Sequence, residues 1–277
     1  MFDPIHLEDS DVELVVQDIV NHHGFDFRSY SRESLKRRIT RLIHMDKFSS
    51  FRAFRQRVSN DAVYFKHFVE QITVNVTEMF RDPSFYKTIR EQILPILATA
   101  PSIRIWHAGC STGEEVYSLA ILLHEANLLH KSILFASDIN TSVVRKVRAG
   151  IYPLHNMQHY SENYSLSGGI GNFSSYYTVK DDYVKFDEGL AKKILLSTHN
   201  LVSDSSFGKF HLIFCRNVMI YFDKDLQERA LHRFDESLEP SGFIALGSKE
   251  TIKFSTVKSR FKQWDNHEKI WQKISGH

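Results

Sequence analysis

The chain of 277 residues is 42% hydrophobic and 25% charged, a composition typical of a globular protein that buries a sizeable core. No apolar run reaches the roughly 18 residues that a membrane-spanning helix needs, and the first residues lack the basic and apolar regions of a secretory signal. Two cysteines, Cys110 and Cys215, are too few for a disulfide framework. We therefore expect a cytoplasmic protein with one large domain or two smaller ones.

The formal net charge is +2, but the charges are unevenly distributed. Residues 26–57 contain ten lysines and arginines and three acidic residues. Within this stretch, apolar residues recur at helical spacing and leave the basic side chains on the other faces. Such a surface is either simply solvated or meets an acidic partner. The apolar positions are Leu35, Ile39, Leu42 and Ile43.

Residues 10–73 have the periodicity of an all-helical segment. Ser10, followed three positions later by Glu13, matches a capping box at the start of the first helix. A later helix is expected to begin near Pro83, because proline is favoured in the first turn.

From about residue 100 onward, short apolar strands alternate with helices, which predicts an α/β domain with a largely parallel sheet. The first strand, in "SIRIWHAG", is expected to neighbour the strand in "LIFC". The segment 152–188 interrupts the alternation. Its tyrosine-rich "SSYYTVKDDYVKF" has the pattern of short antiparallel strands, so we predict a small inserted β subdomain.

The loop "HAGCSTGEE" follows the first strand, where ligands bind in open α/β sheets. It is neither a Walker A loop nor G-x-G-x-x-G, since its glycines are Gly109 and Gly113. Glu114 and Glu115 would repel a pyrophosphate, and Asp138 at the end of the second strand suits ribose hydroxyls. The loop is either a tight turn that needs glycine or a site for a nucleoside without pyrophosphate, a description that S-adenosylmethionine fits.

Five motifs then occur in the order and spacing of one family: "ITVNVTEMFRDPSFY", "AGCSTGEEVYSLA", "FASDIN", "HNL" and "IFCRNVMIYFDK". The chain resembles the CheR-type chemoreceptor methyltransferases from about residue 10 to 273. The resemblance implies a helical N-terminal domain over 1–80 and a linker or helix over 81–94. It also implies a Rossmann-like methyltransferase domain over 95–277 that carries the β insert.

This family transfers a methyl group from S-adenosylmethionine to glutamate side chains of chemoreceptors, so the resemblance implies that activity and a chemoreceptor partner. It implies catalytic roles for Arg81 and Tyr221, and receptor binding by the basic helix through Lys36, Arg37, Arg38 and Arg41. The implied cofactor contacts are Asn75, Thr77, Arg81, Gly109, Glu114, Asp138, Asn200, Leu201, Arg216 and Asn217.

The implied chemistry agrees with the residues present. A carboxylate acceptor is already anionic at pH 7 and needs no general base, so the enzyme mainly has to align the reacting atoms. We accordingly expect no Ser/His/Asp constellation and no metal site. Two positions depart from the family pattern: the β insert lacks the glycine and arginine pattern of a receptor-peptide dock, and Ser248 replaces an expected histidine.

Several alternatives remain open at this point. Cys110 with His107 could form a nucleophilic pair, although burial as a small filler is the simpler interpretation. The chain could be a cofactor-binding signalling module without turnover, or a methyltransferase with another acceptor, such as nucleic acid or a small carboxylate. The motif used to methylate base amines is missing, so we expect no nucleic-acid partner. We also expect a monomer.

Overall fold

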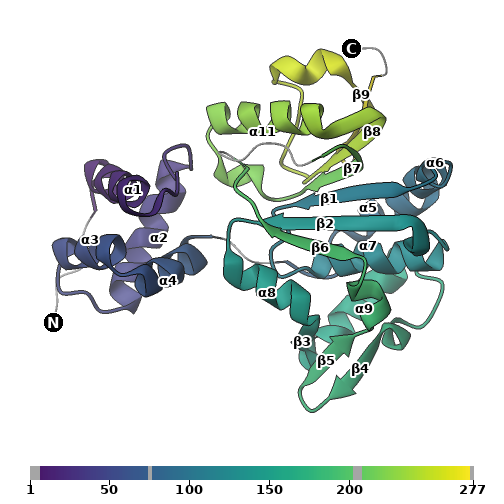
Figure 1. The fold of residues 1–277 in the computed structure, drawn as a ribbon, viewed down its shortest axis with the longest axis horizontal. Helices are drawn as coiled ribbons and strands as arrows, with labels where there is room; N and C mark the ends of the chain where they lie inside the picture. The colour runs from purple at the N-terminus through teal and green to yellow at the C-terminus, as the bar shows by residue number, and fades with distance from the viewer. Residues whose placement is uncertain (1–6, 74–76, 202–207, 275–277) are drawn as a thin grey trace. The chain divides into compact units, whose positions relative to one another are not determined.

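The computed structural model describes residues 7–73, 77–201 and 208–274 (Figure 1). An all-helical N-terminal region and an α/β region with a Rossmann-like sheet are both present, which confirms the predicted fold class.

The chain forms two compact units. The helical unit consists of the described residues of Met1–Asn75 together with Ile220–Ala230. The α/β unit consists of those of Val76–Met219 and Leu231–His277. The predicted end of the helical domain at residue 80 and the predicted start of the methyltransferase domain at residue 95 stay predictions.

The apolar faces of four helices form the core of the helical unit. All four apolar positions predicted for the basic helix are buried, which confirms its orientation. Aromatic rings fill the rest, with Phe54 and Phe68 fully buried. The helices are α1 (Asp9–His23), α2 (Arg32–Met45), α3 (Phe51–Asn60) and α4 (Ala62–Ile72).

The predicted capping box of Ser10 and Glu13 is wrong. Helix α1 begins at Asp9, two residues before the start that an N-cap at Ser10 implies, so Ser10 already lies inside the helix. The Glu8 amide donates to Asp11 Oδ2 over 2.9 Å instead. Two acidic residues in the first turn also suit the positive end of the helix dipole.

A seven-stranded sheet forms the α/β unit, in the order β6-β2-β1-β7-β8-β10-β9. The five strands from β6 to β8 are parallel, and the last two pair antiparallel. Strand β1 lies beside β7, as predicted. The strands are β1 (Ile103–Ala108), β2 (Ser132–Asp138), β6 (Ile194–Thr198), β7 (Phe210–Cys215), β8 (Leu238–Leu246), β9 (Phe261–Asp265) and β10 (Ile270–Lys273).

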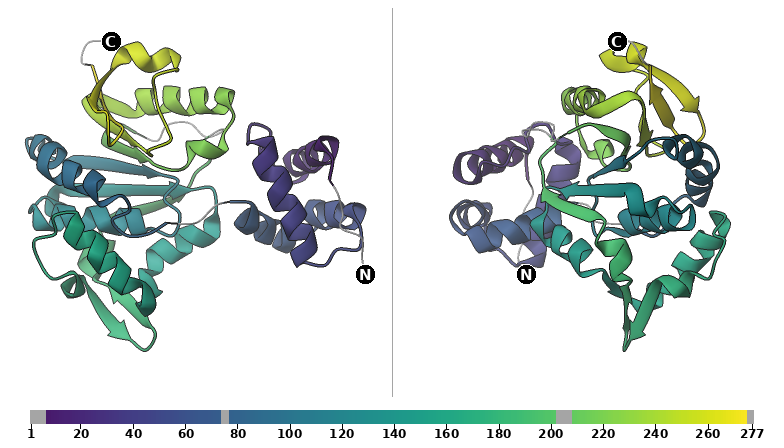
Figure 2. Two further views of the ribbon diagram at one scale, coloured as in Figure 1. Left: turned by 180° about the vertical axis from the view of Figure 1, so that it is seen from behind. Right: turned by 45° about the vertical axis from the view of Figure 1, so that its right-hand side comes forward.

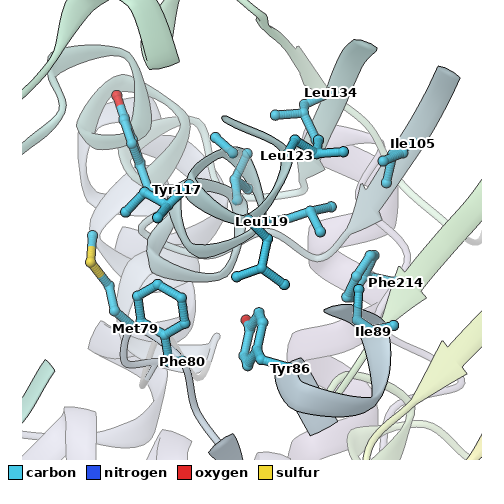
Figure 3. Packing of buried hydrophobic residues seen from close by; sticks show 14 of the residues in the cluster. Met79, Phe80, Tyr86, Ile89, Ile105, Tyr117, Leu119, Leu123, Leu134 and Phe214 are labelled. Atoms are coloured by element: carbon cyan, nitrogen blue, oxygen red, sulfur yellow. The ribbon is translucent and has the colours of Figure 1, made fainter. Parts of the chain in front are cut away.

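Helices cover both faces of this sheet (Figure 2). On one face, Ile105 and Leu134 join the large core that Figure 3 shows from close by, against Leu119 of α7. On the other face, Trp106 contacts Phe234 of α11 with ring centroids 5.5 Å apart. The alternation of Ile105 and Trp106 follows from the two-residue period of a strand. Apart from α9, the α-helices that lie wholly or partly in the described α/β unit are α5 (Pro83–Thr88), α6 (Leu94–Leu97), α7 (Glu114–Glu125), α8 (Thr141–Ala149), α10 (Glu188–Ala191) and α11 (Lys224–Ser237).

Helix α5 begins at Pro83, as predicted, and continues through a π-helical turn, Ile89–Ile93, into α6. A π turn inserts one extra residue per turn and is frequent near functional sites.

The inserted segment contains the predicted antiparallel strands, in the order β3-β5-β4. These are β3 (Ile151–Pro153), β4 (Tyr177–Lys180) and β5 (Tyr183–Phe186). The same segment also contains a helix that was not predicted from the sequence, α9 (Met157–Leu166). Its buried face consists of Met157, Tyr160, Asn163 and Tyr164, which carry little of the aliphatic periodicity that marks a helix.

Both cysteines are buried free thiols. Burial raises the pKa of each thiol well above its ordinary value, which disfavours the thiolate that a nucleophilic Cys110 would need. Within the described ranges, no helix is long and apolar enough to cross a membrane, and no cluster of His, Cys, Asp and Glu could hold a metal ion.

Candidate active site

The loop between β1 and α7 lies at the carboxyl edge of the sheet. Its first two amides, of Gly109 and Cys110, both donate to the Ser137 carbonyl of β2, over 2.8 and 2.9 Å. Gly109 and Gly113 have positive φ angles of 78° and 96°. Both glycines are therefore needed for the backbone path, so the tight-turn interpretation of the loop holds alongside any binding role.

Asp138 joins this loop to the end of β2. Its Oδ2 accepts from the Ser111 amide and its Oδ1 from the Asn140 amide, each over 2.9 Å. Burial raises the pKa of this carboxyl group, while the amide hydrogen bonds act in the opposite direction. The carboxyl group is thus held rigidly beside the loop. This is the residue predicted from the sequence to bind ribose hydroxyls.

The two adjacent glutamates at the start of α7 have different surroundings. Glu114 is 6% exposed and accepts a hydrogen bond of 2.5 Å from Thr112 Oγ1. Burial raises its pKa to about 7. Glu115 has a different partner, because its Oε1 lies 2.9 Å from His107 Nδ1. Of these two glutamates, Glu115 pairs with His107 and lies 3.7 Å from Arg216, whereas Glu114 has no cationic partner among the described ion pairs.

Arg216 follows β7 at the same edge and is 8% exposed. Its guanidinium pairs with Asp82 over 2.6 Å and stacks 3.9 Å from the Phe85 ring centroid. A further hydrogen bond of 3.4 Å reaches the Arg81 carbonyl. Arg216 therefore ties the predicted cofactor segment around Arg81 to the end of β7.

Several strained backbone positions lie around this edge. Four residues other than glycine adopt positive φ angles between 50° and 60°, namely Phe80, Asp82, Ser111 and Asn217. Such angles cost on the order of 1 kcal/mol or more each and persist where the surrounding structure enforces them. They are typical of binding and catalytic sites.

The other predicted cofactor residues of the α/β unit also lie near strand ends. Leu201 is buried and Asn200 half-buried, just after β6, where the His199 amide donates to the Asp138 carbonyl over 3.1 Å. Thr77 and Arg81 are half-buried. Asn75 lies outside the described residues.

Tyr221 and the basic residues predicted to bind receptor belong to the helical unit. The Tyr221 carbonyl accepts from the Ser31 amide over 2.8 Å, and the Arg38 guanidinium lies 5.8 Å from the Tyr221 ring centroid. Lys36 forms an ion pair of 2.8 Å with Asp9. Arg37 and Arg41 are exposed.

The residues at the sheet edge fit a cationic nucleoside that carries no phosphate. Two buried polar atoms, Ser111 Oγ and Arg216 Nε, have no hydrogen-bond partner within the described chain. With the carboxyl groups of Asp138 and Glu114, they offer donors and acceptors for hydroxyl and amino groups. The loop from 109 to 113 contains no basic side chain that would neutralise a phosphate.

Comparison with known proteins agrees with a site for a nucleoside cofactor without phosphate. Residues 75–270 match the family described as "CheR methyltransferase, SAM binding domain". Residues 10–73 match "CheR methyltransferase, all-alpha domain". The chain belongs to the CheR methyltransferase family. It is an enzyme that uses S-adenosylmethionine as methyl donor, as the resemblance implied.

Individual relatives of this CheR-family chain extend over most of its length. It is 42% identical to the Cher3 protein of Pseudomonas putida over 265 residues, which cover 96% of this chain and 97% of that protein. It is 31% identical to a chemotaxis protein methyltransferase of Salmonella typhimurium, covering 92% and 88% of the two chains. A chemotaxis protein methyltransferase of Listeria monocytogenes is 30% identical, with coverages of 83% and 85%.

Three residues with prominent contacts at this edge were not predicted. Asp82 was in a quoted motif without a role, and Glu115 was expected only to repel a pyrophosphate, yet they pair with Arg216 and His107. Glu250 accepts four backbone hydrogen bonds. An acid four residues after an apolar strand end, as in "ALGSKE", is the signal that could have drawn attention to Glu250.

Replacing Gly109 by alanine should damage both the fold and cofactor binding. The new Cβ would lie 2.5 Å from Val218 Cγ2, in addition to the left-handed φ of 78°. We expect a loss of about 2–4 kcal/mol in unfolding free energy and at least tenfold weaker binding of S-adenosylhomocysteine. Chemical denaturation and calorimetric titration measure the two effects.

The matched control is Gly24→Ala, because Gly24 has a similar φ of 70° but no atom within 4 Å of the added Cβ. It should cost about 1–2 kcal/mol and leave cofactor binding unchanged. Equal losses in the two variants would show that the contact with Val218 is unimportant.

Glu114→Gln should stabilise the protein at high pH while weakening cofactor binding. A folded pKa of about 7, above the usual 4.5, means that the folded state loses stability as pH rises from about 4.5 to 7. The glutamine variant avoids this loss, so its stability relative to the parent should increase over that window by up to about 3 kcal/mol.

Cofactor affinity should depend on pH in the opposite direction to stability. An ionised Glu114 is a better hydrogen-bond acceptor for donor groups on the cofactor than a protonated one. Affinity of the parent protein should rise with pH through about 7, and the glutamine variant should lack this rise. Exposed Glu91 supplies the control variant Glu91→Gln, which should follow the parent in both measurements. A pH-independent affinity in the parent would contradict the role of Glu114.

Proposed function

We propose that this protein methylates glutamate side chains in the cytoplasmic helical region of a chemoreceptor. The observation that carries the proposal is family membership over both regions of the chain, the all-α region and the cofactor-binding region. Relatives at about 30% identity are named chemotaxis protein methyltransferases. The resulting product would be a glutamate methyl ester.

The charges of the helical unit support an acidic protein acceptor. Arg37 and Arg41 are exposed on α2, while Lys36 reaches the solvent side of the same helix with a partly exposed ammonium. Arg38 is half-buried beside Tyr221. Exposed arginines offer forked donors for carboxylates on a receptor helix, an attraction that salt would weaken.

The reaction needs little acid–base machinery. S-adenosylmethionine, when bound, supplies a methyl group on a positively charged sulfur. A glutamate carboxylate oxygen forms the new bond to the methyl carbon, the bond from carbon to sulfur breaks, and no proton is transferred. The protein therefore has to bind, orient and exclude water, which agrees with a site built from hydrogen bonds rather than from a nucleophile or a base.

Within this proposal, Arg81 and Tyr221 act on the reacting groups. Arg81 would hold a carboxylate through its guanidinium, either of the cofactor or of the acceptor. Tyr221 would donate a hydrogen bond that orients the acceptor oxygen. Asp138 would accept from ribose hydroxyls, and Glu114 would serve the methionine or ribose end. Asn200, Leu201, Arg216 and Asn217 would flank the remainder of the cofactor.

Incubation with a chemoreceptor cytoplasmic domain tests the acceptor directly. Peptide mass spectrometry should find added methyl groups on glutamates, and mild alkali should remove them as methanol. Tyr221→Phe and Arg81→Ala should each lower kcat/KM for the receptor by at least tenfold, equivalent to about 1.4 kcal/mol. Tyr221→Phe should leave the affinity for S-adenosylhomocysteine within twofold of the parent.

Three outcomes would contradict this assignment. Methyl transfer that is untouched by both substitutions would exclude the proposed roles of Arg81 and Tyr221. An alkali-stable methylated product, or modification of added nucleic acid, would show a different acceptor. Cofactor binding without any turnover would instead identify a signalling module.

A further inference from the structure

Glu250 is a buried carboxyl group that has no place in the proposed reaction. It lies beyond β8 and is 5% exposed. Its Oε1 accepts from the amides of Val218 and Met219, over 2.9 and 2.7 Å. Its Oε2 accepts from the amides of Asn217 and Gly247, over 3.0 and 2.6 Å. All four described donors are backbone groups, so the carboxylate forms the centre of a small polar nest.

Three consecutive amides of this nest belong to the loop after β7. That loop begins with Arg216 and turns at Asn217, whose φ is 60°. The Glu250 carboxylate accepts a hydrogen bond from each of these three amides. One carboxylate therefore holds three consecutive amides of the strained turn, and all three hydrogen bonds would be lost without it.

The loop in turn contacts the predicted cofactor residues on both sides. Val218 fills the space next to Gly109, since a Cβ on that glycine would lie 2.5 Å from Val218 Cγ2. Arg216 reaches Asp82 and the Arg81 carbonyl. Any shift of the loop backbone would consequently be transmitted to the loop after β1 and to the segment around Arg81.

Gly247 shows how closely the nest is packed. A Cβ there would lie 2.8 Å from both the Asn217 amide nitrogen and Glu250 Oε2. A side chain at position 247 would therefore collide with both the carboxylate and the turn that it holds. The loops after β7 and β8 are thus joined by direct contacts through Glu250.

We propose that Glu250 is a positioning residue for the S-adenosylmethionine site, which acts by fixing the backbone of residues 217–219 and makes no contact with the cofactor. The inference rests on the cofactor roles proposed above for Arg216, Asn217 and Gly109. It does not depend on which acceptor is methylated.

Glu250→Gln tests the proposal with minimal change in volume. The glutamine side chain has an NH2 donor in place of one accepting oxygen. This donor would face two backbone N–H donors, so the loop has to move. Calorimetric titration with S-adenosylhomocysteine should show a dissociation constant raised at least tenfold. Deuterium exchange of the peptide that contains residues 217–219 should become faster. The titration and the exchange experiment are both carried out well below the melting temperature of the variant.

The matched control is Glu125→Gln, the same substitution at another buried glutamate. Glu125 ends α7, about 16 Å along the helix from Glu114. It pairs with Arg90 over 2.7 Å and accepts from Tyr176 over 3.0 Å. This variant should melt at a lower temperature than the parent but bind S-adenosylhomocysteine with a dissociation constant within twofold of it.

Glu250→Asp provides a second variant in case the glutamine protein does not fold. It keeps both accepting oxygens but withdraws them by one methylene group, so binding should be weakened less than by glutamine. Binding within twofold of the parent in Glu250→Asp and, where it folds, in Glu250→Gln, with a lowered melting temperature, would overturn the proposal and leave Glu250 a purely structural residue. Because the titration needs no acceptor, a failed receptor assay would not affect this result.

Discussion

The hydrogen bond from the Ser111 amide to Asp138 Oδ2 is the interaction around which the cofactor edge is organised. It joins the loop after β1 to the end of β2, and the Ser137 carbonyl adds two further amide hydrogen bonds to the same loop. Ser111 adopts a positive φ of 50° in the process. A rigid carboxylate next to a glycine-dependent turn is a preorganised acceptor, so little reorganisation is needed when a ligand with hydroxyl groups binds.

Buried carboxyl groups recur along this edge with three different tasks. Asp138 orders the loop after β1, Glu250 orders the loop after β7, and Glu114 remains a buried acid with a pKa of about 7. Burying a carboxylate is costly unless hydrogen bonds compensate. Burial raises the pKa of all three carboxyl groups, but Asp138 and Glu250 accept hydrogen bonds from backbone amides of neighbouring loops, whereas the Glu114 side chain accepts from the Thr112 hydroxyl. This difference marks Glu114 as the carboxyl group best suited to meet a ligand.

The sequence allowed much of this arrangement to be predicted, because the signals were local or followed from topology. Strand and helix alternation predicted the parallel sheet, and parallel strands bring Gly109 and Asp138 to one edge. Helix α9 was missed because tyrosines and Asn163 replace the aliphatic side chains of a usual core face. The contacts of Glu250 with the loop after β7 could not be predicted, since they join residues more than 30 positions apart through backbone amides that leave no pattern in the side chains.

A calorimetric titration of S-adenosylhomocysteine into the parent protein and into Asp138→Asn would test the central claim most directly. The asparagine keeps the shape of the side chain but presents one donor in place of an acceptor. The account predicts saturable binding by the parent and at least tenfold weaker binding by the variant, a loss of about 1.4 kcal/mol or more. Equal affinities would contradict it, because the cofactor site would then not depend on the carboxylate that organises the loop after β1.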